Sequence, residues 1–283
     1  MNDTPRDRLG RFGIWRRSPD VTVGFAVEVE ALGYRALWVG GSPSGDLRLV
    51  EELLDATSSL TLATGIVNMW NSDAHDVAAA FARIQARHAG RLLLGIGAGH
   101  REVTEQYRSP YETLEGYLQT LLDDGIPAGS LVLAALGPRM LRLAADRTAG
   151  AHPYLVTPEH TRRARELLGP DALLAPEQAV VLEADPERAR AVARPPIATP
   201  YLGMANYRNN LRRLGWADAD LDDGGSDALI DALVAHGTPE QVAARLTEHL
   251  EAGADHVTMQ VIGAHEATVL DTFRRLAPVL GAG

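Results

Sequence analysis

The sequence predicts an α/β fold, and specifically a (β/α)8 barrel in which eight parallel strands alternate with helices. Short apolar segments and amphipathic helical segments alternate almost throughout the 283 residues. Eight strand–helix repeats suit a single barrel of this length. A doubly wound sheet is the alternative, but the chain has no early G-x-G-x-x-G turn between a strand and a helix.

Eight segments have the length and apolar character of buried parallel strands. In chain order they are residues 11–15, 36–39, 60–66, 92–96, 131–134, 151–155, 179–182 and 256–261.

The helices between these strands have recognisable beginnings and ends. Ser18-Pro19, Thr157-Pro158 and Thr238-Pro239 each place a capping side chain before a proline, which suits the first helical position. Glycine follows several of the helices, as expected where the chain turns out of a helix. Clear helical patterns cover residues 21–32, 73–88, 111–122, 138–145, 158–168 and 239–252.

One stretch interrupts the repeat between the seventh and eighth strands. Residues 183–236 hold additional helical segments and the turn-rich run 218–226. An insertion of this length in a barrel is commonly a lid or a wall over the ligand site.

Composition excludes several classes of protein. The formal net charge of −10 argues against a general nucleic-acid surface, and the absence of cysteine removes disulfides and thiolate chemistry. No apolar run approaches the length of a membrane span, and the charged N-terminus lacks a signal-peptide core. We therefore expect a cytoplasmic protein without a membrane or nucleic-acid partner.

The chain also lacks the usual signatures of metal and serine hydrolases. Its nine histidines are scattered without the i, i+4 pattern of a zinc site, and there is no G-x-S-x-G motif. We expect no metal site.

The most informative pair of segments is residues 60–73 and 90–100, two strands joined by a helix. The first ends around Gly65, Ile66 and Asn68, and the second ends at Gly97, Gly99 and His100. The carboxyl ends of parallel strands are where such folds bind ligands, and glycines there would let a planar ring lie on the backbone. Packing at the barrel end, with Asn68 capping its own turn, is the alternative.

His100 would lie at the rim where chemistry occurs in such barrels. An imidazole titrates near neutrality, so it could exchange a proton with a substrate while a hydride moves. A rim histidine bonded to a neighbouring loop is an equal alternative. His152, at the sixth strand, is a weaker candidate, and Trp15, Trp38 and Trp70 are read as core residues rather than stacking partners.

A candidate anion site follows the fifth strand, where Gly137, Pro138, Arg139 and Met140 open a helix. Free backbone amides and the positive end of the helix dipole favour an anion there, and Arg139 adds charge. A plain Gly-Pro helix start is the alternative reading.

Taken together in order, these segments resemble the luciferase-like family of flavin and deazaflavin oxidoreductases. The resemblance runs from about residue 10 to residue 280. It rests on Leu32-Gly-Tyr-Arg-Ala-Leu-Trp-Val39, Thr64-Gly-Ile66 with Asn68, Gly90-Arg-Leu-Leu-Leu-Gly-Ile-Gly97, Ala134-Ala-Leu-Gly-Pro-Arg-Met140, and residues 237–245 and 252–257.

The resemblance implies a single barrel domain over residues 1–283, with its insertion at about 183–236. Residues 38–46 and 134–140 resemble the branch that uses coenzyme F420. The cofactor would then lie at the carboxyl ends of the strands, against a non-proline cis peptide at Gly65–Ile66, with its phosphate held by residues 137–140. Many relatives carry an acid or a histidine at the end of the second strand. Gly40-Gly-Ser-Pro43 stands there instead, so His100 is the remaining candidate for proton transfer.

Three functions remain open. The first is an F420-dependent oxidoreductase that moves a hydride between the deazaflavin and a small organic substrate. The second is an FMN-dependent monooxygenase, and the third is a flavin-binding barrel without catalysis. The resemblance also implies a homodimer, because members of this family are often dimers.

Overall fold

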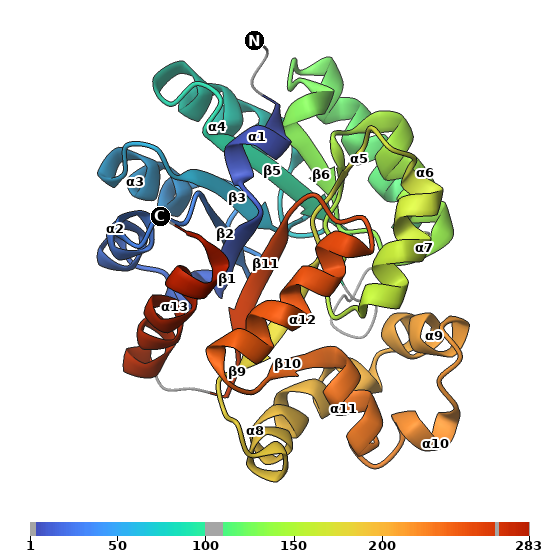
Figure 1. Cartoon of the computed structure of the whole chain (residues 1–283). Helices are drawn as coiled ribbons and strands as arrows, with labels where there is room; N and C mark the ends of the chain where they lie inside the picture. Colours follow the sequence, from blue (N-terminus) through green and yellow to red (C-terminus); the bar gives the residue numbers. More distant parts are fainter. Residues whose placement is uncertain (1–3, 100–109, 264–265, 283) are drawn as a thin grey trace.

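The strands form one parallel sheet that curls into a barrel, with the helices on its outside. The computed structural model describes residues 4–99, 110–263 and 266–282, and within these ranges the sheet has 11 strands. Every strand pairing is parallel, and the order along the sheet is β10-β9-β11-β1-β2-β3-β5-β6-β7-β8, with β4 paired to β5. Figure 1 shows the strands at the centre and the helices around them.

The strands follow one another around the barrel largely in chain order. Their bounds are β1 (Phe12–Arg17), β2 (Ala36–Gly40), β3 (Thr61–Gly65), β4 (Val67–Asn68), β5 (Leu92–Gly97), β6 (Leu131–Leu133), β7 (Gly150–Ala151), β8 (Leu173–Leu174), β9 (Glu177–Val181), β10 (Val234–His236) and β11 (Val257–Val261).

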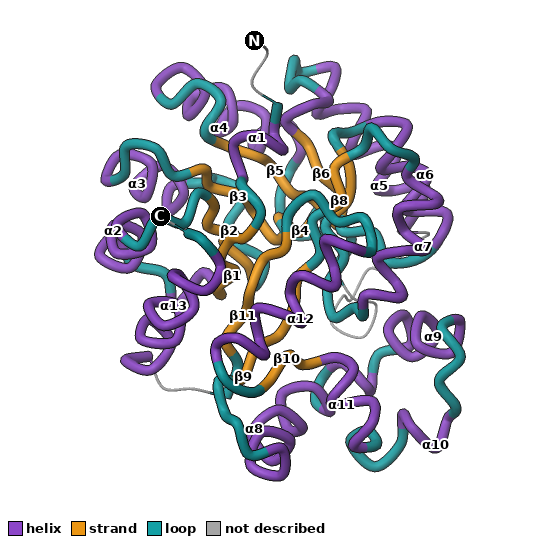
Figure 2. The backbone as a smooth tube through the Cα atoms, in the orientation of Figure 1, coloured by secondary structure: helices purple, strands orange, loops and turns teal. Residues whose placement is uncertain are grey.

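Most helices lie between successive strands and cover the outer face of the sheet, whereas α8 to α11 are grouped at one end of the barrel (Figure 2). Their bounds are α1 (Pro5–Leu9), α2 (Val23–Ala31), α3 (Arg48–Ala56), α4 (Ala74–Arg87), α5 (Pro110–Asp123), α6 (Pro138–Arg147), α7 (Pro158–Leu168), α8 (Pro186–Ala198), α9 (Ala205–Arg213), α10 (Asp218–Leu221), α11 (Asp227–Leu233), α12 (Pro239–Glu251) and α13 (Glu266–Leu280).

The barrel closes through the chain segment that contains β8 and β9. On one side, β8 pairs with β7. On the other side, the backbone N–H groups of Asp255 and Thr258 donate to the carbonyls of Leu174 and Pro176. This closure rules out the doubly wound alternative, because an open sheet keeps two unpaired edges.

Side chains alternate between the barrel interior and the helix layer. Leu37 and Val39 of β2 join the large cluster between sheet and helices, whereas Trp38 joins a small cluster inside the barrel. Leu9 of α1 belongs to that inner cluster, so α1 plugs the end of the barrel where the strands begin. The alternation therefore decides which side chains of a strand face the barrel interior and which face the helices.

Three strand predictions need correction. The predicted third strand, 60–66, is interrupted at Ile66 and continues as β4. The predicted sixth strand, 151–155, keeps only its first residue, because Pro153 has no N–H to continue the ladder. The predicted seventh strand, 179–182, begins earlier, because β9 starts at Glu177 and the short strand β8 precedes it.

The segment predicted as an insertion also contains β10, which pairs with β9 and was not foreseen. The helices of this segment share an apolar cluster with residues of β9 and β10. Arg190 of α8 pairs with Asp231 of α11, with 2.5 Å between Nη2 and Oδ2. Figure 1 places α8 to α11 beside the end of the barrel toward which the strands run.

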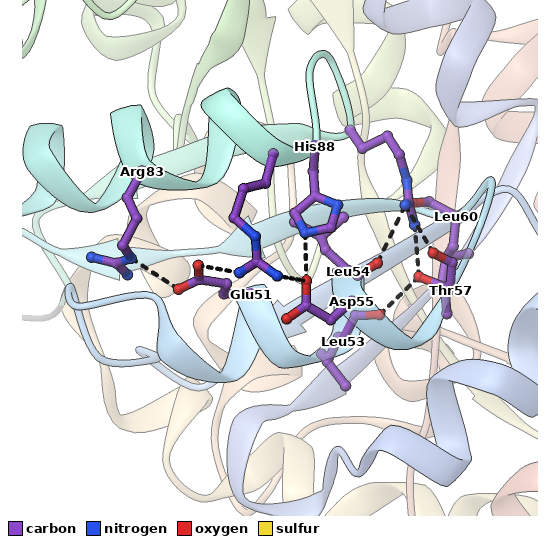
Figure 3. A network of polar contacts seen from close by, with 10 residues as sticks. Glu51, Leu53, Leu54, Asp55, Thr57, Leu60, Arg83 and His88 are labelled. Atoms are coloured by element: carbon purple, nitrogen blue, oxygen red, sulfur yellow. Dashed lines mark hydrogen bonds and ion pairs between the residues drawn. The ribbon is translucent and has the colours of Figure 1, made fainter.

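A polar network on the outside of the barrel fixes α3, α4 and the start of β3 relative to one another (Figure 3). Glu51 accepts from Arg83 and Arg87, and Asp55 accepts from Arg87 and His88. Arg91 donates to backbone carbonyls at the end of α3 and to that of Leu60. These groups lie on the helix layer, so the network supports the scaffold rather than the candidate site.

Candidate active site

The third strand ends in a bulge at the mouth of the barrel. β3 stops at Gly65, the Gly65–Ile66 peptide is cis, and the chain then pairs with β5 through β4. The cis peptide expected at this position is therefore confirmed. Gly65 and Ile66 are partly exposed, whereas Thr64 and Val67 on either side are buried.

The structure brings five of the predicted cofactor residues together around this bulge. The Ile66 side chain lies against Gly97, where an added methyl group would be 3.0 Å from Ile66 Cδ1. Asn68 lies against Gly99, with Nδ2 2.6 Å from such a methyl group. Asn68 Oδ1 also accepts from the backbone N–H of Trp70, which is the self-capped turn considered above.

The bare backbone at the ends of β2 and β3 has a protein side chain against it. The Trp15 indole of β1 lies so close that a methyl group on Gly40 would be 1.9 Å from Cζ2. On Gly65 it would be 2.6 Å from Trp15 Nε1 and 3.1 Å from His152 Nε2. These two glycines are thus required by packing inside the barrel, whatever lies on the outer side of the bulge.

The predicted anion site lies at the start of α6, which follows β6, the neighbour of β5 in the sheet. Gly137 is the N-cap residue and makes no side-chain cap, and Pro138 occupies the first turn. Arg139 is exposed and its guanidinium lies 3.6 Å from the centre of the Tyr111 ring. Met140 is half-buried against the core.

Arg213, at the end of α9, adds a second guanidinium to this helix start. Its Nη2 lies 3.6 Å from where a Gly137 methyl group would be. Neither Arg139 nor Arg213 has an ion-pair partner among the described residues. The insertion supplies Arg213, and sequence reasoning missed it because no local motif links residue 213 to residue 137.

His100, the predicted proton-transfer residue, lies outside the described residues. The end of β2 and the turn after it, Gly40-Gly41-Ser42, hold no acid or histidine, as the sequence indicated. The acid–base groups that the structure does place near the mouth come from other strands.

Two histidines lie inside the barrel below the mouth. His152 stacks on Trp38 at 4.1 Å between ring centres, and Trp38 Nε1 donates to His256 Nε2 at 3.1 Å. Burial lowers the pKa of both histidines to about 4, so both are neutral at pH 7. His152 Nδ1 donates to the Ala175 carbonyl, which leaves Nε2 buried without a partner in the described part of the chain.

Glu177 of β9 is the buried acid that sequence reasoning missed. Its carboxyl group is completely buried, and one oxygen accepts from the Leu155 N–H at 3.1 Å. The other oxygen has no partner within the described ranges. Burial raises its pKa to about 8, so the group is mostly protonated at pH 7. A lone glutamate inside an apolar strand, Glu177 to Val181, was the available signal.

Phenol hydroxyl groups line the mouth beside Trp15. Tyr154 follows β7, and its ring lies 5.5 Å from the Trp15 ring. Its hydroxyl donates to Gln260 Oε1 at 2.7 Å and lies 2.9 Å from the Tyr201 hydroxyl of the insertion. The Tyr154 hydroxyl therefore links three parts of the chain: the segment after β7, β11 through Gln260, and the insertion through Tyr201.

Among the described residues, no three His, Cys, Asp or Glu side chains are grouped so as to hold a metal ion. Within the same ranges, no helix is long and apolar enough to cross a membrane.

Comparison with known proteins identifies the family. The sequence profile of the luciferase-like monooxygenases matches residues 8–123 and 113–256. The chain belongs to this family. No curated protein matches this luciferase-like chain by sequence.

Solved structures of low sequence identity share the luciferase-like fold. An F420-dependent secondary alcohol dehydrogenase in complex with an F420–acetone adduct superposes with a TM-score of 0.73 at 14% identity, over 95% of this chain and 98% of that one. The F420-dependent tetrahydromethanopterin reductase of Methanopyrus kandleri gives 0.67 at 15% identity, over 95% and 98%. An FMN complex of the oxygenating component of 3,6-diketocamphane monooxygenase from Pseudomonas putida gives 0.65 at 14%, over 95% and 98%. At these identities the likeness establishes the fold.

Proposed function

We propose that this luciferase-like chain is an F420-dependent oxidoreductase that acts on a small organic molecule. One observation supports it most: the partly exposed bulge at Gly65–Ile66 and the uncapped start of α6 belong to neighbouring parts of the barrel mouth. The bulge offers backbone and small side chains to a flat ring. The helix start, with Arg139 and Arg213, offers amides and positive charge to a phosphate.

The residues present fit a ring with an anionic tail. Ile66 of the bulge and Ala134 both lie against Gly97, and both are partly exposed, as is Ala98, so a ring would meet apolar groups there. Gly137 leaves the first backbone amides of α6 without a side-chain cap. Gly65, Gly97 and Gly99 would position the ring through the backbone, and Gly137, Pro138, Arg139 and Met140 would hold the tail.

When bound, the deazaflavin would supply the hydride chemistry. The chain's own contribution would be to bind the ring and substrate in contact, to exclude water, and to hold the substrate's oxygen. The neutral histidines and protonated Glu177 keep ionised groups out of the interior beneath the mouth. His100 stays our candidate for proton transfer, and the cytoplasm and a homodimer stay our proposals for location and assembly.

FMN is the second candidate cofactor, because the family name is that of monooxygenases and one structurally similar monooxygenase is a complex with FMN. The residues at the start of α6 suit either phosphate. The resemblance of residues 38–46 and 134–140 to the F420 branch is what favours the deazaflavin.

Fluorescence titration of the purified chain with F420 and with FMN tests this proposal. We expect micromolar binding of F420 and weaker binding of FMN. Tighter binding of FMN than of F420 would make FMN the proposed cofactor. Cofactor binding without turnover over a broad substrate panel would favour a non-catalytic barrel. If neither compound binds, the proposed function is wrong.

Two arginine variants sharpen the titration. Arg139→Ala and Arg213→Ala should each weaken binding of the phosphate-bearing cofactor roughly threefold to tenfold, since each removes one charge-assisted contact. Binding of the chromophore without its phosphate tail should not change. Arg142→Ala, an exposed arginine farther along α6, is the matched control.

A further inference from the structure

The mouth of the barrel has two chemically different halves. One half, at β3 to β6, presents bare backbone and small side chains. The other half, which we call the phenolic half, consists of Trp15, Tyr154, Tyr201 and Gln260. A flat ring on the first half would leave the second half facing whatever the ring reacts with.

The rings of the phenolic half form a continuous wall from β1 to the insertion. Successive ring centres lie 5.5 Å apart from Trp15 to Tyr154 and 5.3 Å apart from Tyr154 to Tyr201. Tyr207 of α9 packs edge-on against Tyr201 behind the wall, also at 5.3 Å. Trp15 and Tyr207 are buried, whereas Tyr154 and Tyr201 are half-buried and reach the surface. An apolar molecule at this half of the mouth would therefore meet the accessible parts of Tyr154 and Tyr201.

The hydrogen bonds of this half have a defined direction. Tyr154 has one hydroxyl hydrogen, and it goes to Gln260 Oε1 at 2.7 Å. The 2.9 Å contact between the two phenols must then be donated by Tyr201. Among the described residues, no group then donates to the Tyr201 oxygen. A ligand that donates a hydrogen bond to its lone pairs therefore fits better than one that only accepts.

Charge also limits the ligand. Burial raises the pKa of Tyr154 and Tyr201 above the ordinary 10, so both phenols stay neutral at physiological pH. Glu177, a carboxyl group that acts electrostatically on both phenols, is buried and mostly protonated at pH 7. Arg17 at the end of β1 is exposed, and its positive charge partly opposes the increase in the pKa of Tyr201.

We propose that the phenolic half binds a compact, uncharged organic molecule through an aromatic contact with Tyr154 and Tyr201, with a hydroxyl group that donates a hydrogen bond to the Tyr201 oxygen. The assignment of this molecule as the substrate rests on the proposed function. The binding itself does not depend on it. Tyr201 is thereby a substrate-contacting residue supplied by the insertion.

The test compares three probes of one shape: cyclohexanol, its methyl ether and cyclohexanecarboxylate. Binding to the full chain is measured by calorimetry, with and without saturating F420. We expect the alcohol to bind more tightly than the ether, roughly threefold to tenfold for one hydrogen bond, and the carboxylate to bind most weakly.

Tyr201→Phe should abolish the preference for the alcohol over the ether while leaving binding of the ether unchanged. A merely structural role of Tyr201, fastening the insertion to the barrel, would weaken both probes together. Tyr117→Phe is the matched control, because it removes a phenol hydroxyl from α5, a helix that contributes no residue to the phenolic half; that hydroxyl is buried and has no partner among the described residues. It should leave the preference intact.

Several results would overturn the proposal: equal binding of alcohol and ether, a preference for the carboxylate, no binding of any probe, or a preference that survives Tyr201→Phe. Failure of the proposed function is a separate outcome. If F420 and FMN both fail to bind but the alcohol preference is present and depends on Tyr201, the phenolic site stands and the cofactor assignment falls.

Discussion

Replacing Glu177 by glutamine should make the protein less sensitive to rising pH. The wild-type carboxyl group is completely buried, and burial raises its pKa from the ordinary 4.5 to about 8. The folded state therefore keeps a proton that the unfolded chain releases above pH 4.5. The stability that this proton supports is complete below pH 4.5 and is lost as the pH rises through 8.

The size of the effect follows from the two pKa values. A change from 4.5 to about 8 corresponds to a loss of about 5 kcal/mol of stability at high pH. About 3 kcal/mol of this loss falls between pH 5.5 and pH 8.5. Glutamine has the same shape and accepts the Leu155 N–H in the same way, but it has no proton to lose.

Urea unfolding of wild type and Glu177→Gln at pH 5.5 and 8.5 measures this. The free energy of unfolding of the variant, relative to wild type, should rise by about 3 kcal/mol between the two pH values. All other titrating groups are common to both proteins and cancel. A difference that stays the same at both pH values would refute the reasoning, because it would mean that Glu177 ionises as it does in water.

Glu183→Gln is the matched control. Glu183 is partly exposed, and hydrogen bonds from the Arg188 guanidinium lower its pKa. Its carboxylate is ionised in both folded and unfolded states throughout this range. Its substitution should therefore leave the difference between the two pH values unchanged.

Three further results are expected. Gly40→Ala should cost about 1–3 kcal/mol of stability in urea unfolding, since the new methyl group would lie 1.9 Å from Trp15 Cζ2. Adding Trp15→Leu to this variant should recover part of the loss. An unchanged stability of Gly40→Ala would contradict the packing described. Gly65→Val should weaken F420 binding at least tenfold, about 1.4 kcal/mol, by displacing Trp15 and the bulge; an unchanged affinity in a folded variant would remove the bulge from the cofactor site. Lowering the pH from 6.5 to 5 should reduce the free energy of unfolding by about 5 kcal/mol, net of the opposite effect of Glu177. The reason is that four buried histidines stay neutral in the folded state and are protonated on unfolding: His152, His160, His249 and His256. A free energy of unfolding that does not change with pH would show that these histidines are hydrated in the fold.

Local sequence was informative wherever the relevant contact is between neighbours in the chain. Pro158 and Pro239 start helices where the pattern placed them, with Thr157 and Thr238 as the caps. The bulge at Gly65–Ile66 also lies where the sequence indicated.

Contacts between distant segments were not readable in the same way. Gly65 was taken as space for a ring, yet in the fold Trp15 lies against both Gly65 and Gly40 on the inner side of the barrel. The sequence around Gly40 does not predict this contact, because residues 15 and 40 become neighbours only when β1 and β2 pair.

By itself, then, the sequence determined the alternation of strands and helices, the boundaries of the capped helices and the positions of most strand ends, since periodicity and capping act over a few residues. Only the tertiary structure decided which side chains share the mouth: Tyr201 against Tyr154, Arg213 beside Gly137, and Glu177 sealed within the barrel. Closure of the barrel brings these residues into contact. The burial that it creates raises the pKa of the Glu177 carboxyl group and lowers the pKa values of the buried histidines. Neither the distances nor the burial can be read from the order of residues along the chain.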